Sequence, residues 1–165
     1  MSLIIETGFV VPNANSYVTI AEARAFAIAR GVTLSAVDTV VEKNCIIAID
    51  YLESFRNRFK GYKIGFAQGL QFPRVSILID NYWLGYNTIP PMLKNAQCQL
   101  VIELHNGIDL TPSAADGKFL VREKIDVIEN EWAHGGSMLP TLTKFEQFLA
   151  PLLKPSTGGL ITHRA

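Results

Sequence analysis

The longest regular pattern of apolar positions predicts a helix in the first third of the chain. Apolar residues recur there at alternating spacings of four and three, which places them on one face of an α-helix. They are Val41, Cys45, Ala48, Leu52, Phe55 and Phe59. Ser35 and Asp38 supply start signals, so the helix begins at Ser35 or Val37 and ends near Phe59, before Gly61.

Three further helices are predicted from capping residues and apolar stripes. Thr19 and Glu22 have capping-box spacing, and the alanine-rich sequence after them runs to Gly31. Another helix opens after a pair of prolines and closes at Gly107. Its stripe is Leu93, Ala96, Leu100 and Leu104. A last helix spans about residues 140–153.

The rest of the chain is predicted to be extended or irregular. Residues 61–88 form a long connection with a short strand at 75–79, and the β-branched residues of 119–132 predict a hairpin. We therefore predict a mainly α protein, a small bundle of about four helices with a β-hairpin and extended N- and C-terminal arms. Residues 1–153 form the domain, and residues 154–165 form a flexible C-terminal arm.

Charge and hydropathy restrict the classes of partner. The 165 residues include 15 Lys and Arg and 15 Asp and Glu, so the formal net charge is zero. This balance excludes a strongly basic nucleic-acid binder as the default, but it leaves room for a local basic face. The mean hydropathy of +0.20 favours a protein that hides part of its surface against partners.

Cysteine usage and the missing targeting signals point to the cytosol. Cys45 and Cys98 lie in apolar helical stretches outside any CxxC pair, so we expect buried thiols in a reducing compartment. The N-terminus lacks the basic region of a signal peptide, and no apolar run reaches the ~20 residues of a membrane span. We expect a protein that resides in the cytosol, or is assembled from it, without membrane contact.

Catalytic patterns are missing from the sequence. Its histidines, His105, His134 and His163, form no metal-ligand pattern, and the glycine-rich motifs of nucleotide sites do not occur. Asp50 and Glu53 lie one helical turn apart, and a solvated helix face explains them better than acid–base catalysis does. We expect a protein that is not an enzyme and that holds no cofactor or metal.

One segment, residues 54–79, combines cations with aromatic residues and contains no acid. Its cations are Arg56, Arg58, Lys60, Lys63 and Arg74, and its rings are Phe55, Phe59, Tyr62, Phe66 and Phe72. Three interpretations stay open: helix-end cations with core rings, a basic surface facing DNA, and specific single-strand binding. The neighbouring Tyr82, Trp83 and Tyr86 fit an interface and internal packing equally well.

Six short motifs occur in the order and spacing of a known protein family. They are PNANSYV at 12–18, AIDYL at 48–52, FPR at 72–74, IPPMLKNA at 89–96, VREKI at 121–125 and LAPLL at 149–153. In this order they resemble the small tailed-phage proteins labelled DnaT-like ssDNA-binding protein, which are similar to the phage head–tail connector (adaptor, head-completion) family. The resemblance covers nearly the whole chain up to Leu153.

This resemblance implies a structural connector that forms a ring beneath the portal, extends the DNA channel and docks the tail. The implied partners are further copies of the chain in a homo-oligomeric ring of about twelve, the portal protein, and the next adaptor or tail-completion protein. Non-specific contact with packaged DNA is also implied. The implied location is the head–tail junction of the virion, after assembly in the host cytoplasm. The DnaT-like label implies an alternative, a replication accessory that binds single-stranded DNA, against which the zero net charge argues.

The connector interpretation assigns the candidate residues to three roles. The DNA-channel candidates are Arg56, Arg58, Lys60, Lys63 and Arg74. The subunit-interface candidates are Phe72, Tyr82, Trp83 and Tyr86. The portal-binding candidates are Lys154, Leu160, Ile161 and Arg164.

Overall fold

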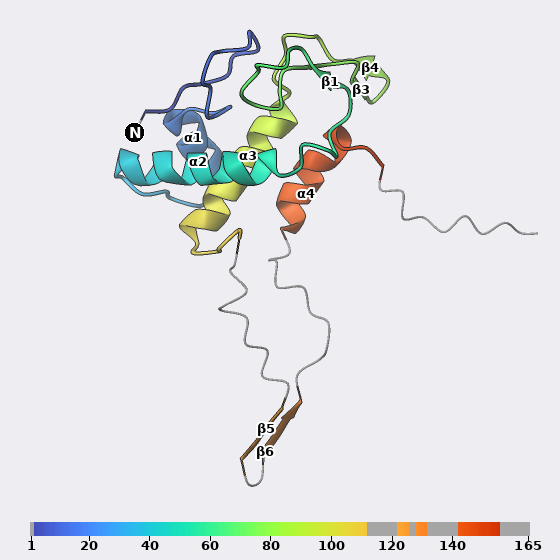
Figure 1. The fold of residues 1–165 in the computed structure, drawn as a ribbon. Coiled ribbons are helices and arrows are strands. Elements are labelled where there is room, and N and C mark those ends of the chain that lie inside the picture. The colour runs from blue at the N-terminus through green and yellow to red at the C-terminus, as the bar shows by residue number, and fades with distance from the viewer. Residues whose placement is uncertain (1, 112–121, 126–127, 132–141, 156–165) are drawn as a thin grey trace, which may run out of the picture.

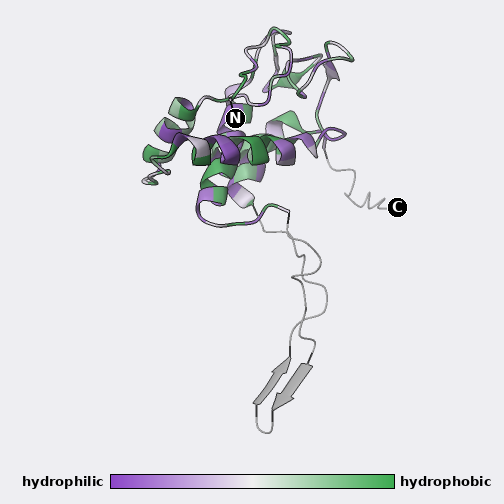
Figure 2. Ribbon diagram, turned by 60° about the vertical axis from the view of Figure 1, so that its left-hand side comes forward, coloured by the Kyte–Doolittle hydropathy of each residue, from purple (hydrophilic) through white to green (hydrophobic). Residues whose placement is uncertain are grey.

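Four α-helices make up the body of the chain over the residues that the structure, a computed structural model, describes (Figure 1). The described residues are 2–111, 122–125, 128–131 and 142–155. The helices are α1 (Ile20–Ile28), α2 (Asp38–Glu53), α3 (Pro91–His105) and α4 (Thr143–Leu149), and a 3-10 turn, Ala150–Leu152, continues α4. Hydrophobic and hydrophilic residues alternate along these helices, as amphipathic packing requires (Figure 2). The predicted mainly α fold is confirmed.

The start of α1 is the capping box that the sequence predicts. The Thr19 hydroxyl accepts a hydrogen bond from the Glu22 backbone N–H at 3.1 Å, and the Glu22 carboxylate accepts one from the Thr19 N–H at 2.7 Å. These bonds satisfy N–H groups that have no partner inside the helix. Beyond the other end, Gly31 adopts a left-handed φ of +74°, which glycine tolerates without a steric penalty.

The second helix is shorter than predicted. It ends at Glu53, and the chain continues to Phe59 through tight turns, in which backbone N–H groups bond to carbonyls three residues back. Phe59 is still buried because the turns carry it to the core, where it pairs as an isolated bridge with Leu153. The predicted stripe is therefore right about burial of Phe59 and wrong about the helical conformation of the last six residues.

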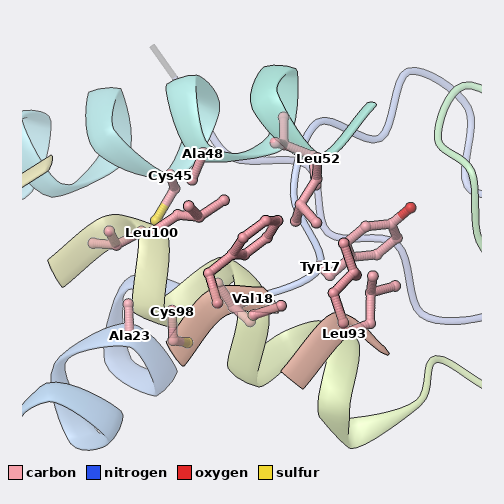
Figure 3. Close-up of a cluster of buried hydrophobic side chains, with 14 of the residues drawn as sticks. Tyr17, Val18, Ala23, Cys45, Ala48, Leu52, Leu93, Cys98 and Leu100 are labelled. Atoms are coloured by element: carbon pink, nitrogen blue, oxygen red, sulfur yellow. The ribbon is translucent and has the colours of Figure 1, made fainter. Parts of the chain in front are cut away.

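Helix α3 is the centre of the core, since it contacts each of the other three helices. Leu93, Ala96 and Leu100 of its predicted stripe are fully buried. Figure 3 shows Leu93 and Leu100 in one cluster with residues of α1, α2 and the N-terminal arm. Both cysteines lie in this core, and burial raises the pKa of Cys45 to about 11 and that of Cys98 to about 12. The prediction of buried thiols is confirmed.

The long connection between α2 and α3 folds into two small antiparallel sheets. Strand β1 (Tyr62–Lys63) pairs with β2 (Arg74–Val75), and β3 (Leu78–Ile79) pairs with β4 (Tyr82–Trp83). The strand predicted over 75–79 is split into β2 and β3 because Ser76 adopts a left-handed φ of +60°. The predicted hairpin in the second half of the chain is confirmed, as β5 (Arg122–Ile125) pairs with β6 (Ile128–Glu131).

The N-terminal arm, residues 2–18, lies beside this connection on one side of the helical body (Figure 1). Its chain makes a loop between Ile5 and Ser16, and these two residues then form a parallel bridge, with both segments running in the same direction. The arm enters the core at Tyr17 and Val18, both fully buried. In the described residues, no helix has the length and apolar character that crossing a lipid bilayer requires.

A buried amide on α3 joins this arm to α2. Gln97 is fully buried, its Oε1 accepts from the Tyr17 backbone N–H at 2.9 Å, and its Nε2 donates to the Ser16 hydroxyl at 2.9 Å. The same nitrogen donates to the Cys45 carbonyl at 3.2 Å. One side chain thus satisfies polar groups of two other segments inside the core.

Replacing Gln97 by Leu tests this role. Leucine fills a similar volume but leaves the buried Tyr17 N–H unpaired and removes the bonds to the Ser16 hydroxyl and the Cys45 carbonyl, so we expect the free energy of unfolding to fall by about 3 kcal/mol in urea denaturation. The matched control, Gln147→Leu on the exposed side of α4, changes it by less than about 0.5 kcal/mol. Equal midpoints for the two variants would contradict the assignment.

The thiols provide a second test of the core. Because burial disfavours the thiolate of Cys45 and Cys98, we expect neither to react with a disulfide reagent at neutral pH in the folded protein. Both should react at once in denaturant, as measured by the absorbance of the released chromophore. Rapid labelling of the folded protein would show that the core packing described here is wrong.

Candidate nucleic-acid interface

Arg74, one of the predicted DNA-channel residues, lies inside the protein. Its Nε donates to the Lys60 carbonyl at 2.8 Å, its Nη2 to the Gly61 carbonyl at 2.7 Å, and its Nη1 to Gln71 Oε1 at 2.9 Å. The guanidinium therefore holds strand β2 against the chain that follows α2. This placement corrects the surface role expected for Arg74, because the cation is buried and engaged within its own subunit.

Glu53 balances this buried cation through an intervening amide. The Gln71 backbone N–H and its Nε2 each donate to the Glu53 carboxylate, both at 2.9 Å, while Gln71 Oε1 accepts from Arg74. Glu53 is half-buried and Asp50 is exposed. The solvated-face interpretation therefore holds for Asp50, whereas Glu53 is part of the hydrogen-bonded support of the connection.

The two predicted lysines are half-buried and bonded to backbone carbonyls. Lys60 Nζ donates to the Pro151 carbonyl at 2.8 Å, and Lys63 Nζ donates to the Gln68 carbonyl at 2.7 Å. Partial burial lowers the pKa of Lys63, and the nearby Arg56 and Arg74 lower it further against the opposing effect of Glu53. The positive charge of Arg56 is therefore close enough to Lys63 to disfavour its protonated form.

Arg56 and Arg58 are the predicted cations whose residues are exposed. Both lie in the turns after α2, and the Arg58 guanidinium carbon is 5.2 Å from the centroid of the Phe55 ring. Because residues 54–58 form turns and not a helix, the two arginines do not share a helix face. Contact of these two arginines with DNA stays a prediction.

A rigid turn presents Phe66 to solvent. Buried Gln68 organises it, since its Oε1 accepts from the Ile64 N–H and its Nε2 donates to the carbonyls of Leu70 and Pro73 at 3.0 and 2.8 Å. Phe66 is fully exposed at the tip. Phe66 is one of the rings of residues 54–79 but is not among the predicted interface residues. Its position in a glycine-flanked turn, outside any apolar stripe, is the sequence signal for its exposure.

The aromatic residues of β4 and the following turn are exposed as well. Trp83 is 73% exposed, and Tyr82 and Tyr86 are similarly open. Internal packing, one of the two open interpretations, is therefore wrong for these three residues. Phe72 differs, since it is fully buried and packs edge-to-face on Phe59 with ring centroids 5.3 Å apart. The surface role expected for Phe72 is corrected accordingly.

We define the aromatic surface as the exposed rings of the long connection. Its members are Tyr62, Phe66, Tyr82, Trp83 and Tyr86. All five belong to strands β1 and β4 or to the turns next to them. The connection has little regular structure of its own, so its shape depends on the buried Arg74, Gln68 and Phe72 described above.

The portal-binding candidates can be placed only in part. Lys154 is exposed, its backbone N–H donates to the Arg58 carbonyl at 2.7 Å, and its Nζ donates to the Asn57 carbonyl at 3.4 Å. The start of the C-terminal arm is thus fixed beside the turns after α2. Leu160, Ile161 and Arg164 lie outside the described residues.

The described ranges contain no potential metal site, since no three His, Cys, Asp or Glu side chains gather within them. Burial raises the pKa of Tyr17 well above its usual value, with Glu53 adding to the effect, so this phenol stays protonated. Its oxygen accepts a hydrogen bond from the Phe72 N–H at 2.9 Å, which is a structural role.

Comparison with known proteins then gives the family. The model of the family described as "Putative DnaT-like ssDNA binding protein" matches residues 1–165. The chain belongs to this family. No curated protein and no solved structure matches the chain. The match agrees with the DnaT-like part of the resemblance seen in the sequence, and it gives no support to the head–tail connector part.

Arginine substitutions distinguish structural from surface cations. Arg74→Ala removes three hydrogen bonds inside the protein, so we expect the free energy of unfolding to fall by about 3 kcal/mol. Arg56→Ala, at an exposed position, changes it by less than about 0.5 kcal/mol. Urea denaturation followed by circular dichroism measures both, and equal stability of the two variants would contradict the buried role of Arg74.

Proposed function

We propose that the protein binds single-stranded nucleic acid without sequence specificity, through the aromatic surface. The observation that carries the proposal is the exposure of five aromatic rings within one connection. Exposed rings stack on unpaired bases, which every sequence offers and which a duplex hides. The family description, which names ssDNA binding, supports the same class of ligand.

The charges near the aromatic surface fit weak phosphate contact. Arg56 and Arg58 are exposed, and the sequence from Ser54 to Tyr86 contains a single acid, Asp80 in the turn between β3 and β4. Arg74, Lys60 and Lys63 are engaged with backbone carbonyls of the chain. Few free cations imply few released counterions, so binding depends mainly on stacking and only weakly on salt concentration. This answers the objection that a neutral chain makes a poor nucleic-acid binder.

A second candidate is self-assembly, as in the ring expected of a head–tail connector. A separate observation favours it, because Ile28 is 67% exposed on α1 and Val37 and Val40 are exposed at the start of α2. Aliphatic side chains do not stack on bases as rings do, and exposed apolar surface of this kind is typical of protein contacts. Binding to the portal and a place in a virion belong to this second candidate.

Fluorescence anisotropy with labelled oligothymidylate tests the first proposal. We expect the protein to bind the single strand more tightly than a duplex of equal length. Trp83→Ala and Phe66→Ala should each weaken single-strand binding about 5-fold or more, because each removes one stacking contact. Gln147→Ala, at an exposed position of α4 outside the aromatic surface and the exposed aliphatic residues, should bind as the wild type does.

Two outcomes would contradict the proposal. One is equal affinity for single strand and duplex, which would indicate phosphate contact alone. The other is unchanged binding in both Trp83→Ala and Phe66→Ala. Multi-angle light scattering of the same samples reports on self-assembly, where Ile28→Ala rather than Trp83→Ala should reduce the mass of the assembly.

A further inference from the structure

Phe9, in the N-terminal arm, is a large apolar side chain held in solvent by a strained loop. It is 74% exposed. The residues on either side have left-handed backbones, Gly8 with φ +104° and Val10 with φ +57°. For a β-branched residue such as Val10 this conformation is a genuine outlier, and it persists only where the surroundings enforce it.

A buried carboxylate enforces this conformation. Glu6 is fully buried, and its two oxygens accept hydrogen bonds from the backbone N–H groups of Gly8 and Val11, each at 2.8 Å. Val11 in turn packs against the core. The loop is therefore fixed at both sides of Phe9, so the ring is displayed by a rigid support and not by a loose end.

The same loop touches the long connection at Asn87, the residue after Tyr86 of the aromatic surface. A Cβ added to Gly8 would lie 1.9 Å from the Asn87 carbonyl oxygen, so the two backbones are in direct contact, and only glycine fits. Phe9 and Tyr86 are the chain neighbours of these two contacting residues. A second contact lies farther along the arm, where a Cβ on Gly69 would meet the Ala14 carbonyl at 3.5 Å.

We propose that Phe9 is a further base-stacking residue, which extends the aromatic surface from Tyr86 onto the N-terminal arm. The inference rests on the proposed single-strand binding and adds a contribution from a segment about 80 residues away in sequence. The ligand at this position is an unpaired base of the bound strand. Glu6 and Gly8 are positioning residues, since they hold the loop and do not themselves face the base.

The experiment compares Phe9 variants by anisotropy with labelled oligothymidylate. Phe9→Ala and Phe9→Leu should each weaken binding about 5-fold, whereas Phe9→Trp keeps a ring and should retain wild-type affinity. The leucine variant separates stacking from plain apolar contact with a protein. Thermal unfolding should be unchanged in all three, because the side chain is exposed. Gln147→Ala, at an exposed position of α4, is the control.

A double-mutant cycle tests the adjacency to Tyr86. If one base bridges both rings, Phe9→Ala with Tyr86→Ala should weaken binding by less than the product of the single effects. Wild-type affinity in Phe9→Ala, while Trp83→Ala is weakened, would overturn this inference and leave the proposed function standing. Failure of the wild-type protein to bind any single strand would remove both.

Discussion

The hydrogen bonds of the buried Gln97 amide decide where the N-terminal arm meets the helices. Leu93, Ala96 and Leu100 bring α3 into the core by apolar burial, which is non-directional and would tolerate several positions of an extended arm. The amide is directional, because its oxygen needs the Tyr17 N–H and its nitrogen needs the Ser16 hydroxyl and the Cys45 carbonyl. An unpaired amide in this core would be costly, so the arm is confined to one register.

The position of the arm in turn determines that of the long connection. Tyr17, fixed by Gln97, presents its phenol oxygen to the Phe72 N–H, and Phe72 fills the core against Phe59. On the other side, Gly8 of the arm meets Asn87 where the connection returns to α3. A connection with only two-residue strands is thus held at its middle by Tyr17 and near its C-terminal end by Gly8. Exposed rings on such a segment are presented in a defined arrangement, which reduces the ordering cost of binding.

The sequence predicts the parts of this structure that depend on local periodicity. The stripe of α3 and the capping box of Thr19 need only residues three and four apart, and both are observed. Partners distant in sequence carry no such signal: Arg74 bonds to the carbonyl of Lys60, and Tyr17 to the N–H of Phe72. A cation next to aromatic residues therefore gives the same pattern whether it faces solvent or the core.

The exposure of an aromatic ring is equally hard to predict from the sequence, because it depends on which other residues already fill the core. Phe72 and Trp83 are large rings in the same connection, yet one is fully buried and the other is open. Burying Arg74 and engaging Lys60 and Lys63 removes much of the basic character that the sequence suggests for this segment. What stays at the surface is mostly aromatic, so stacking must supply most of the affinity for a nucleic acid.

Stacking on one small surface gives a low affinity. The affinity rises when several copies of the protein bind the same strand. The exposed aliphatic residues Ile28, Val37 and Val40 are separate from the rings of the aromatic surface, so association through them does not require those rings.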